Sequence, residues 1–570
     1  DSQRPSYTSS YGSAGNIFYV ANMMGPIYPL YVRNADGTIM YENGMKVYDS
    51  NQTNFARPAF VGNAVRDNEV DRKQTYADML TGKWGVVLTP VKGLSLTANI
   101  GLTNDNTRYN AMYSRFGSQS ATDGLAYVSH QRTFAVNSQY LAEYKTDFGN
   151  SGHNVSVLAG YEIYSLKEQF LEGQNDHLFD PRIGELGNAD GVSSKQTSSY
   201  TADYITQGFL ARAQYDYSGK YFVSGSYRRD GSSRFAPGHR WGNFGSVGAA
   251  WLISSEEFMQ NAGWISMLKI KASYGVQGND NLYPNSNYAR KYYPYSDNYT
   301  HSYNEGTGEY SIDLDYKGNE ELTWESSHSF NVGADFELFG NRLNGSVEYF
   351  SRKTVDLLYS KDVPLSAGNP TGYYPVNVGS IINDGFEASL EGLVVSNSEM
   401  TWSWNVNISH YRNRIVSLDE SVSEEGIKGG NYIYKVGGSL YEAYMRKYAG
   451  VNPENGKAQW YRKVLDEEGR WTGESVVTET FSEASQYELG SVLPKLYGGF
   501  GTIFKAHGID FSAQFSFQLG GKYYDGTYQA LMHTSSGTGT AWHKDGHRSR
   551  LPANPECDIQ RPDGETSVGQ

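Results

Sequence analysis

The feature that most constrains the fold is a strict alternation of side-chain character along residues 209–217. The odd positions there are apolar, and the even positions are mostly polar: Leu210, Arg212, Gln214 and Asp216. Because a strand points successive side chains to opposite faces, this segment has one apolar and one polar face. The same pattern recurs in residues 221–228, 268–277, 330–338 and 509–517. Long strands of this kind suit a wall with lipid on one side and water on the other.

The connections between the patterned segments alternate between short and long. Short turns are predicted near residues 92, 148, 218, 258, 341, 398 and 507. Long connections are predicted over residues 103–132, 166–203, 231–241, 278–325, 354–383 and 412–496, and residues 1–70 are expected to form one large loop. The first four strands are predicted at residues 84–91, 94–102, 133–145 and 154–165. The predicted fold class is therefore all-β: an antiparallel transmembrane β-barrel of about fourteen strands, with short turns on one rim and long extracellular loops on the other.

Composition and spacing argue against several other classes of protein. The net charge of −14 argues against a nucleic-acid binder, and the single Cys557 allows no internal disulfide. No apolar run approaches the ~18 residues that a membrane helix needs. The predicted hairpins begin at irregular intervals, whereas propellers and solenoids need a nearly fixed period. The 47 Tyr and 63 Gly residues fit aromatic girdles and many turns.

Two motifs in the middle of the chain carry a family resemblance. Residues 228–235 read RRDGSSRF, and Trp251 lies on the strand that follows. Residues 322–333 read LTWESSHSFNVG, in which W-E is separated from N-x-G by five residues. Further pieces of the same pattern lie at residues 268–280, between the two motifs, and after them at 377–392, 407–418, 448–461 and 493–500, all in the expected order. Together these pieces resemble the SusC/RagA-type TonB-dependent outer-membrane transporters of Bacteroidota.

The resemblance implies structural roles for the motif residues, which are Arg228, Asp230, Gly231, Arg234, Phe235, Trp251, Trp324, Glu325, Asn331 and Gly333. Asp-Gly-Ser-Ser is also a turn sequence whose Asp caps its own backbone. The alternative role for the arginines is contact with an anionic or sugar substrate at the rim.

The resemblance also implies an architecture and a function. Barrels of this family have about twenty-two strands, so we expect residues 1–570 to be a partial barrel domain that lacks the plug domain and the final strands. We expect an integral protein of the bacterial outer membrane that imports oligosaccharides or oligopeptides. Its expected partners are a SusD-like surface lipoprotein and, through the plug segment, the TonB complex. The alternative function is a passive outer-membrane porin, and the choice between glycan and peptide stays open.

Aromatic residues of the long loops are the candidate substrate-binding residues, because aromatic faces stack on sugar rings and peptides: Tyr292, Tyr293, Tyr295, Tyr373, Tyr374 and Tyr432. The alternative is that they pack the loops or lie in the interfacial girdle. No catalytic motif is present, so we expect neither an enzyme nor a cofactor. A cluster near the end of the chain lacks the helical spacing of a metal site, and no metal is expected: His533, His543, Asp545 and His547.

Overall fold

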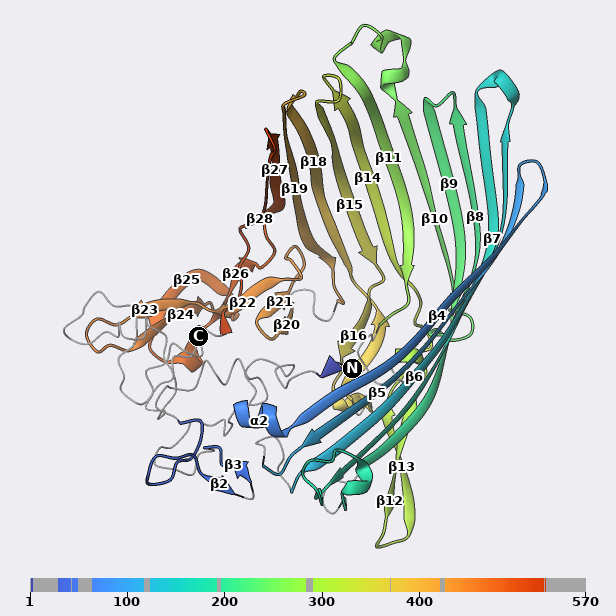
Figure 1. Ribbon diagram of the computed structural model, residues 1–570. Helices are drawn as coiled ribbons and strands as arrows, with labels where there is room; N and C mark the ends of the chain where they lie inside the picture. The colour runs from blue at the N-terminus through green and yellow to red at the C-terminus, as the bar shows by residue number, and fades with distance from the viewer. Residues whose placement is uncertain are drawn as a thin grey trace.

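The computed structural model describes residues 2–3, 29–42, 44–49, 64–116, 123–191, 196–282, 291–369, 371–420, 426–526 and 528. These residues form strands almost throughout, arranged as one large curved sheet with smaller sheets at one end (Figure 1). Among them, no helix is long and apolar enough to cross a membrane.

Within the described residues, the large sheet is antiparallel and contains fifteen strands, one of which, β1 (Ser2–Gln3), has only two residues. The other fourteen confirm the predicted number and order. They are β4 (Arg72–Val91), β5 (Leu94–Tyr113), β6 (Leu125–Asp147), β7 (His153–Asp176), β8 (Gln196–Tyr217), β9 (Tyr221–Ser232), β10 (Trp241–Leu252), β11 (Ile265–Asn279), β14 (Glu325–Leu338), β15 (Leu343–Val355), β18 (Ser380–Ser396), β19 (Met400–Ser417), β27 (Leu496–Ala506) and β28 (Ile509–Leu519).

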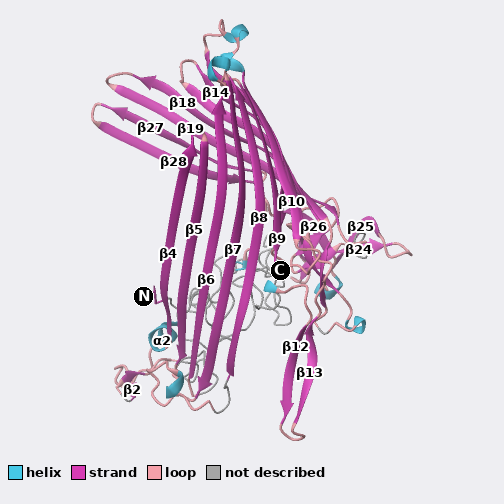
Figure 2. Ribbon diagram, turned by 90° about the vertical axis from the view of Figure 1, so that its right-hand side faces the viewer, coloured by secondary structure: helices cyan, strands magenta, loops and turns pink. Residues whose placement is uncertain are grey.

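Strands β4 to β8 are much longer than predicted, with 20 to 24 residues each. The predicted long connections are therefore wrong over most of residues 103–132 and over half of residues 166–203. β5 stays paired with β6 as far as Tyr113, and β7 stays paired with β6 as far as Asp176. The prediction relied on apolar alternation, but a strand that continues beyond the lipid needs only its backbone ladder and can carry polar residues on both faces. Figure 2 shows these strands running far beyond the rest of the wall.

The two faces of the sheet differ in chemistry as the alternation predicts. On one parity, large apolar side chains are exposed along the wall, among them Val223, Val247, Ile270, Phe330 and Val347. The other parity carries polar contacts. Lys271 on β11 lies 2.9 Å from Asp335 on β14 and 3.5 Å from Glu348 on β15. The first parity is the face for hydrocarbon, and the second lines the lumen.

Several smaller elements lie outside the wall. They are the helix α2 (Ala64–Val70) and the paired strands β2 (Tyr41–Glu42) and β3 (Met45–Lys46), β12 (Asn298–Asn304) and β13 (Glu309–Tyr316), and β16 (Leu358–Asp362) and β17 (Tyr373–Asn377). A four-stranded sheet contains β20 (Ile427–Gly429), β21 (Tyr432–Tyr434), β22 (Glu442–Arg446) and β26 (Gln486–Ser491), and a three-stranded sheet contains β23 (Tyr448–Val451), β24 (Ala458–Leu465) and β25 (Trp471–Thr478). Single 3₁₀ turns are η2 (Gly149–Ser151), η3 (Leu186–Asn188), η4 (Ile253–Ser255), η5 (Glu257–Met259), η6 (Leu365–Ala367) and η7 (Phe481–Glu483).

The sheet has two edges. Strands β1 and β4 lie at one edge and β28 lies at the other, and in the described part of the chain no pairing joins the two. In hydrocarbon, unpaired backbone groups cost several kcal/mol each, so an edge strand there needs a further backbone partner.

Candidate functional site

Tight turns gather at one rim of the wall, and the longest loops lie at the other. Ser218 and Gly219, between β8 and β9, have φ of 53° and 65°, and His507 and Gly508, between β27 and β28, have φ of 51° and 80°. Positive φ at successive residues lets the chain reverse within two residues between β27 and β28 and within three between β8 and β9. The opposite rim therefore carries the long loops, and we call it the mouth.

The RRDGSSRF motif builds two ion-pair clusters on the lumen face near the mouth. In the first, Arg228 Nε donates to both oxygens of Asp230 at 2.6 and 2.8 Å, and its Nη1 donates to Glu162 at 3.0 Å. These residues come from β9 and β7, on either side of β8. A guanidinium held by two carboxylates is a structural tie, and here it joins β7 to β9.

The second cluster centres on Asp280, which directly follows β11. Its carboxylate accepts three hydrogen bonds: from Arg234 Nη1 at 2.9 Å, from the Ser232 hydroxyl at 2.6 Å and from the Tyr204 hydroxyl at 2.8 Å. The Arg234 guanidinium also lies over the Tyr204 ring, 4.3 Å from its centroid. Arg234 and Ser232 are buried. We call these four residues the mouth clasp, because they join β8 and β9 to the loop that follows β11.

The remaining motif residues pack beside the clasp or along the strands. Phe235 is fully buried, and its ring centroid lies 5.5 Å from that of Trp324, whose Nε1 donates to the Arg240 carbonyl at 2.8 Å. Glu325 accepts a bond from the Leu358 amide at 3.0 Å.

At two of the motif glycines, an added side chain would meet close neighbours. A Cβ at Gly231 would lie 3.2 Å from the Trp241 ring, and one at Gly333 would lie 2.7 Å from the Val347 carbonyl oxygen. Trp251 lies at the opposite rim, where its Nε1 donates to Glu256 at 3.1 Å, and the Asn331 amide lies 3.5 Å from the Ser273 hydroxyl.

The candidate aromatic residues come from three different loops. Tyr292 is only 2% exposed and donates to Glu168 on β7 at 2.9 Å, while burial raises the pKa of its hydroxyl. Tyr293 accepts a bond from the Asp203 amide at 3.1 Å, and Tyr295 is half-buried. Tyr373 and Tyr374 lie on β17 and Tyr432 on β21; Tyr373 is exposed, and the other two are half-buried. The structure holds the first two against the wall and leaves Tyr373 the most accessible.

A cavity of about 350 Å³ at the mouth was not anticipated from the sequence. We call it the mouth cavity; its lining comes from β16, the ends of β18 and β19 and the loop sheet of β20 and β21: Leu357, Tyr359, Val378, Ile381, Ile415, Leu418, Asp419, Ile427, Tyr434, Leu440 and Tyr441. Most of these side chains are aliphatic or aromatic. At its edge, Asp419 forms an ion pair with Lys361 at 2.9 Å. The sequence contains one indication of this cavity, namely the apolar residues immediately beyond the strand ends, such as Leu357 and Leu418.

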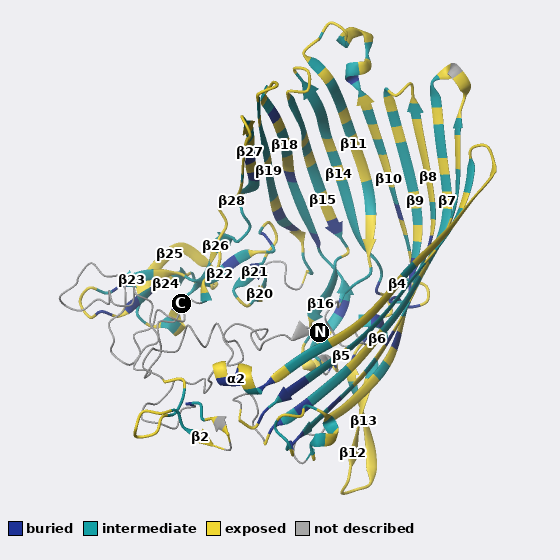
Figure 3. Cartoon of the chain, viewed as in Figure 1, coloured by how far each residue is buried: buried dark blue, intermediate teal, exposed yellow. Residues whose placement is uncertain are grey.

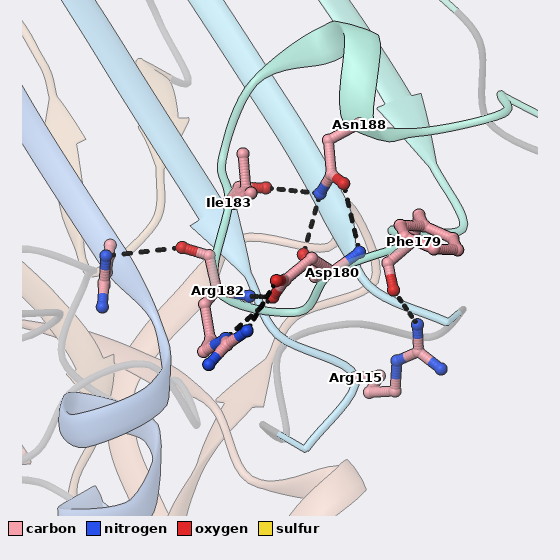
Figure 4. A network of polar contacts seen from close by, with 7 residues as sticks. Arg115, Phe179, Asp180, Arg182, Ile183 and Asn188 are labelled. Carbon is pink, nitrogen blue, oxygen red and sulfur yellow. Dashed lines mark hydrogen bonds and ion pairs between the residues drawn. The ribbon is translucent and has the colours of Figure 1, made fainter.

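The loop between β7 and β8 is fixed by a polar network (Figure 4). The Asn188 amide donates to the Asp180 and Ile183 carbonyls, both at 2.8 Å, and Arg182 donates to both oxygens of Asp180 at 3.0 and 2.8 Å. The Arg182 bonds lower the pKa of the Asp180 carboxyl to about 2. Arg115 donates to the Phe179 carbonyl at 3.5 Å, and yet the Phe179 side chain is 91% exposed. The network thus holds one aromatic side chain in water on an ordered backbone.

The described residues contain no group of three or more His, Cys, Asp or Glu residues placed to hold a metal ion. The cluster considered from the sequence, His533, His543, Asp545 and His547, lies outside the described residues.

The long tilted strands, the polar lumen face and the single rim of long loops define a β-barrel of the outer-membrane type. The chain belongs to the TonB dependent receptor-like, beta-barrel family, whose model matches residues 31–524. It is therefore a protein of the bacterial outer membrane, as predicted.

Relatives and solved structures agree with this assignment. The chain is 27% identical to the TonB-dependent receptor SusC of Bacteroides thetaiotaomicron over 58% of its own length and 31% of SusC. It is 32% identical to TonB-dependent receptor P39 of Formosa agariphila over 53% of this chain and 28% of that protein. The RagAB peptide importer in its open-open state shares the fold, with a TM-score of 0.79 at 22% identity over 98% of this chain and 58% of that one. The chain therefore spans about half of the length of its curated relatives, or less. It covers 51% of receptor P26 of the same Formosa species.

Proposed function

We propose that this chain is the barrel portion of a TonB-dependent transporter that imports an oligomeric nutrient across the outer membrane. The observation that carries the proposal is the family match over residues 31–524, on a wall whose lumen face is polar. Residues 1–570 act as a single barrel unit in this proposal. Transport, rather than covalent chemistry, is the activity that such a wall and its loops serve.

The proposed partners are a SusD-like surface lipoprotein and the TonB complex, with the TonB contact made through a plug segment. Support comes from the similarity to SusC and from the fold shared with the RagAB importer. The long loops at the mouth face outward, where a surface lipoprotein would cover the barrel. In this proposal the mouth clasp keeps the loop after β11 in place while the partner and substrate bind.

The proposed substrate is an oligosaccharide or oligopeptide, and the mouth cavity favours the peptide. The cavity is lined mainly by aliphatic side chains with three tyrosines, Tyr359, Tyr434 and Tyr441. Such a lining suits apolar side chains, of which the cavity has room for more than one, whereas sugars require more hydrogen-bonding groups. Among the candidate aromatics, Tyr373 is exposed and is the proposed first contact for substrate. The buried Tyr292 holds the loop, while Tyr293, Tyr295, Tyr374 and Tyr432 support the mouth surface.

Uptake by the full-length protein tests the proposal. Cells that express it would take up labelled oligopeptides or oligosaccharides, and uptake would stop when the proton gradient is dissipated. A passive porin would give uptake that is proportional to concentration and insensitive to the gradient. Gradient-independent uptake would therefore overturn active transport and favour the porin.

A further inference from the structure

The hairpin of β12 and β13 projects from the mouth away from the rest of the molecule (Figures 1 and 2). Directly opposed residues in an antiparallel pair share one face. The register opposes Tyr303 to Tyr310 and Tyr299 to Leu314. One face, which we call the tyrosine face, is therefore entirely aromatic or aliphatic: Tyr299, His301, Tyr303, Tyr310, Ile312 and Leu314. The opposite face is entirely polar: Thr300, Ser302, Asn304, Glu309, Ser311 and Asp313.

The tyrosine face is uncovered along most of its length (Figure 3). Ile312 is 73% exposed, Tyr310 71%, Tyr299 63% and Tyr303 53%. A contiguous apolar surface of this kind on a soluble segment marks an interaction site. An isolated two-stranded hairpin is also only marginally stable in water, so a partner on this face would stabilise the hairpin.

The root of the same hairpin is fixed to the protein. Tyr316, the last residue of β13, is buried, and its hydroxyl donates to the Pro294 carbonyl at 3.0 Å. Next to it, Lys317 forms an ion pair with Asp297 at 2.7 Å, and Asp297 also accepts a bond from the Gly318 amide at 2.9 Å. Exposure therefore changes within four residues, from the buried Tyr316 to the exposed Ile312. A rooted hairpin presents its apolar face in a defined direction, which lowers the entropic cost of binding.

The charge of the hairpin limits what can cover it. Residues 298–316 contain four carboxylates, Glu305, Glu309, Asp313 and Asp315, and no Lys or Arg. An acidic hairpin that projects beyond the wall suits a protein surface with an apolar groove and a basic rim. It does not suit the anionic surface of a membrane, which attracts basic segments.

We propose that the tyrosine face docks the surface lipoprotein that covers the barrel, with the β12–β13 ribbon lying in an apolar, basic-rimmed groove of that lipoprotein. This inference rests on the proposed function, because it presumes that the barrel has such a partner. The contact lies outside the substrate path, and it anchors the lipoprotein to the barrel through tyrosines, which are frequent anchors at protein interfaces.

Co-purification from the native host tests the docking. Full-length tagged barrel would be compared with the double variant Tyr310→Ser, Ile312→Ser and with the matched control Thr300→Ala, Ser302→Ala on the polar face. We expect the tyrosine-face variant to recover at least tenfold less lipoprotein and the control to recover a normal amount. The heat-induced shift in gel mobility reports barrel folding for both variants.

A photo-crosslinking residue at position 310 or at position 300 gives an independent readout. We expect a crosslink to the lipoprotein from position 310 and none from position 300. Normal lipoprotein recovery by the folded tyrosine-face variant would overturn the docking, as would a crosslink from position 310 only to substrate or to another barrel. If the unaltered barrel recovers no lipoprotein at all, the proposed pairing itself is wrong, which is a distinct outcome.

Discussion

At the scale of single residues, buried charge decides which side chains hold the mouth together. The Asp280 carboxylate accepts three hydrogen bonds within the clasp, so the cost of burying its charge is offset by directed donors. Exposed ion pairs elsewhere, such as Arg470 with Asp466 at 3.1 Å, have the same chemistry without the burial. Such exposed pairs contribute roughly 0–1 kcal/mol. The charged residues of the clasp therefore differ from the exposed ion pairs in how far they are buried and not in residue type.

Replacing Arg234 by Met should destabilise the mouth by about 3 kcal/mol, because the substitution leaves the largely buried Asp280 carboxylate, whose side chain is 12% exposed, without its ion-pair partner. The expected result is rapid protease cleavage within residues 278–325 while the barrel itself stays folded. Arg470→Met, whose native side chain is 73% exposed, is the control and should change the cleavage rate little. Equal protection of both variants would show that the clasp does not hold the loop.

Asp71, which immediately precedes β4, should make the start of that strand sensitive to pH. Burial raises the pKa of its carboxyl to about 7, and its Oδ1 accepts a bond from the Ser114 amide at 2.8 Å. The folded protein binds this proton more tightly than the unfolded chain, so the stability from protonated Asp71 is complete below pH of about 4 and is lost as pH rises through 7.

Hydrogen exchange of the first residues of β4 measures this effect. After correction for intrinsic exchange, their protection should be lower at pH 8 than at pH 5 in the unaltered protein. In Asp71→Asn, protection should be equal at both values. A pH dependence that survives the substitution would contradict the role of Asp71.

At the scale of elements, alternation predicted where each strand crosses the lipid but not where it ends. The strand predicted at residues 94–102 extends in the structure over Leu94–Tyr113, which is β5. It is longer than predicted because polar residues such as Asn104 and Asp105 continue the same ladder with β6. Of the mouth clasp, only Arg234 was predicted to be structural from its motif, whereas its partners Tyr204 and Asp280 lie far from it in sequence. The mouth cavity could not be predicted, since it joins β16, β18, β19 and the β20–β21 loop through contacts between residues far apart in sequence. For the same reason, the loop tyrosines could be named as candidates but not separated into buried and exposed.

Replacing Tyr434 by Ala should weaken substrate uptake through the mouth cavity. Loss of one aromatic wall is expected to raise the apparent KM for an apolar oligopeptide by roughly tenfold, which corresponds to about 1.4 kcal/mol, with little change in maximal rate. Tyr41→Ala, at an exposed residue of β2, is the matched control. An unchanged KM for every peptide and glycan tested would exclude the cavity as a substrate site.

At the scale of the whole molecule, the wall explains how a chain with a mean hydropathy of −0.58 can reside in a membrane. Half of each strand faces water in the lumen, and the extended ends of β4 to β8 and the loop sheets add further polar surface. The strand number and the alternation of turns followed from the sequence, because both depend on local periodicity and turn residues. The curvature of the sheet and the strands that form its edges could not be predicted from the sequence, because both depend on pairing along the whole sheet.

Neighbouring residues of one wall strand face different surroundings, hydrocarbon on one side and water on the other. Single spin labels in the full-length protein, after native cysteines are replaced, test it at Val223, Val247 and Val347 and at their neighbours Ser224, Ser246 and Ser346. Labels at the three valines should collide with oxygen dissolved in lipid, whereas labels at the three serines should collide with a water-soluble nickel complex. The reverse pattern, or equal exposure of both sets to the nickel complex, would contradict a lipid-facing wall.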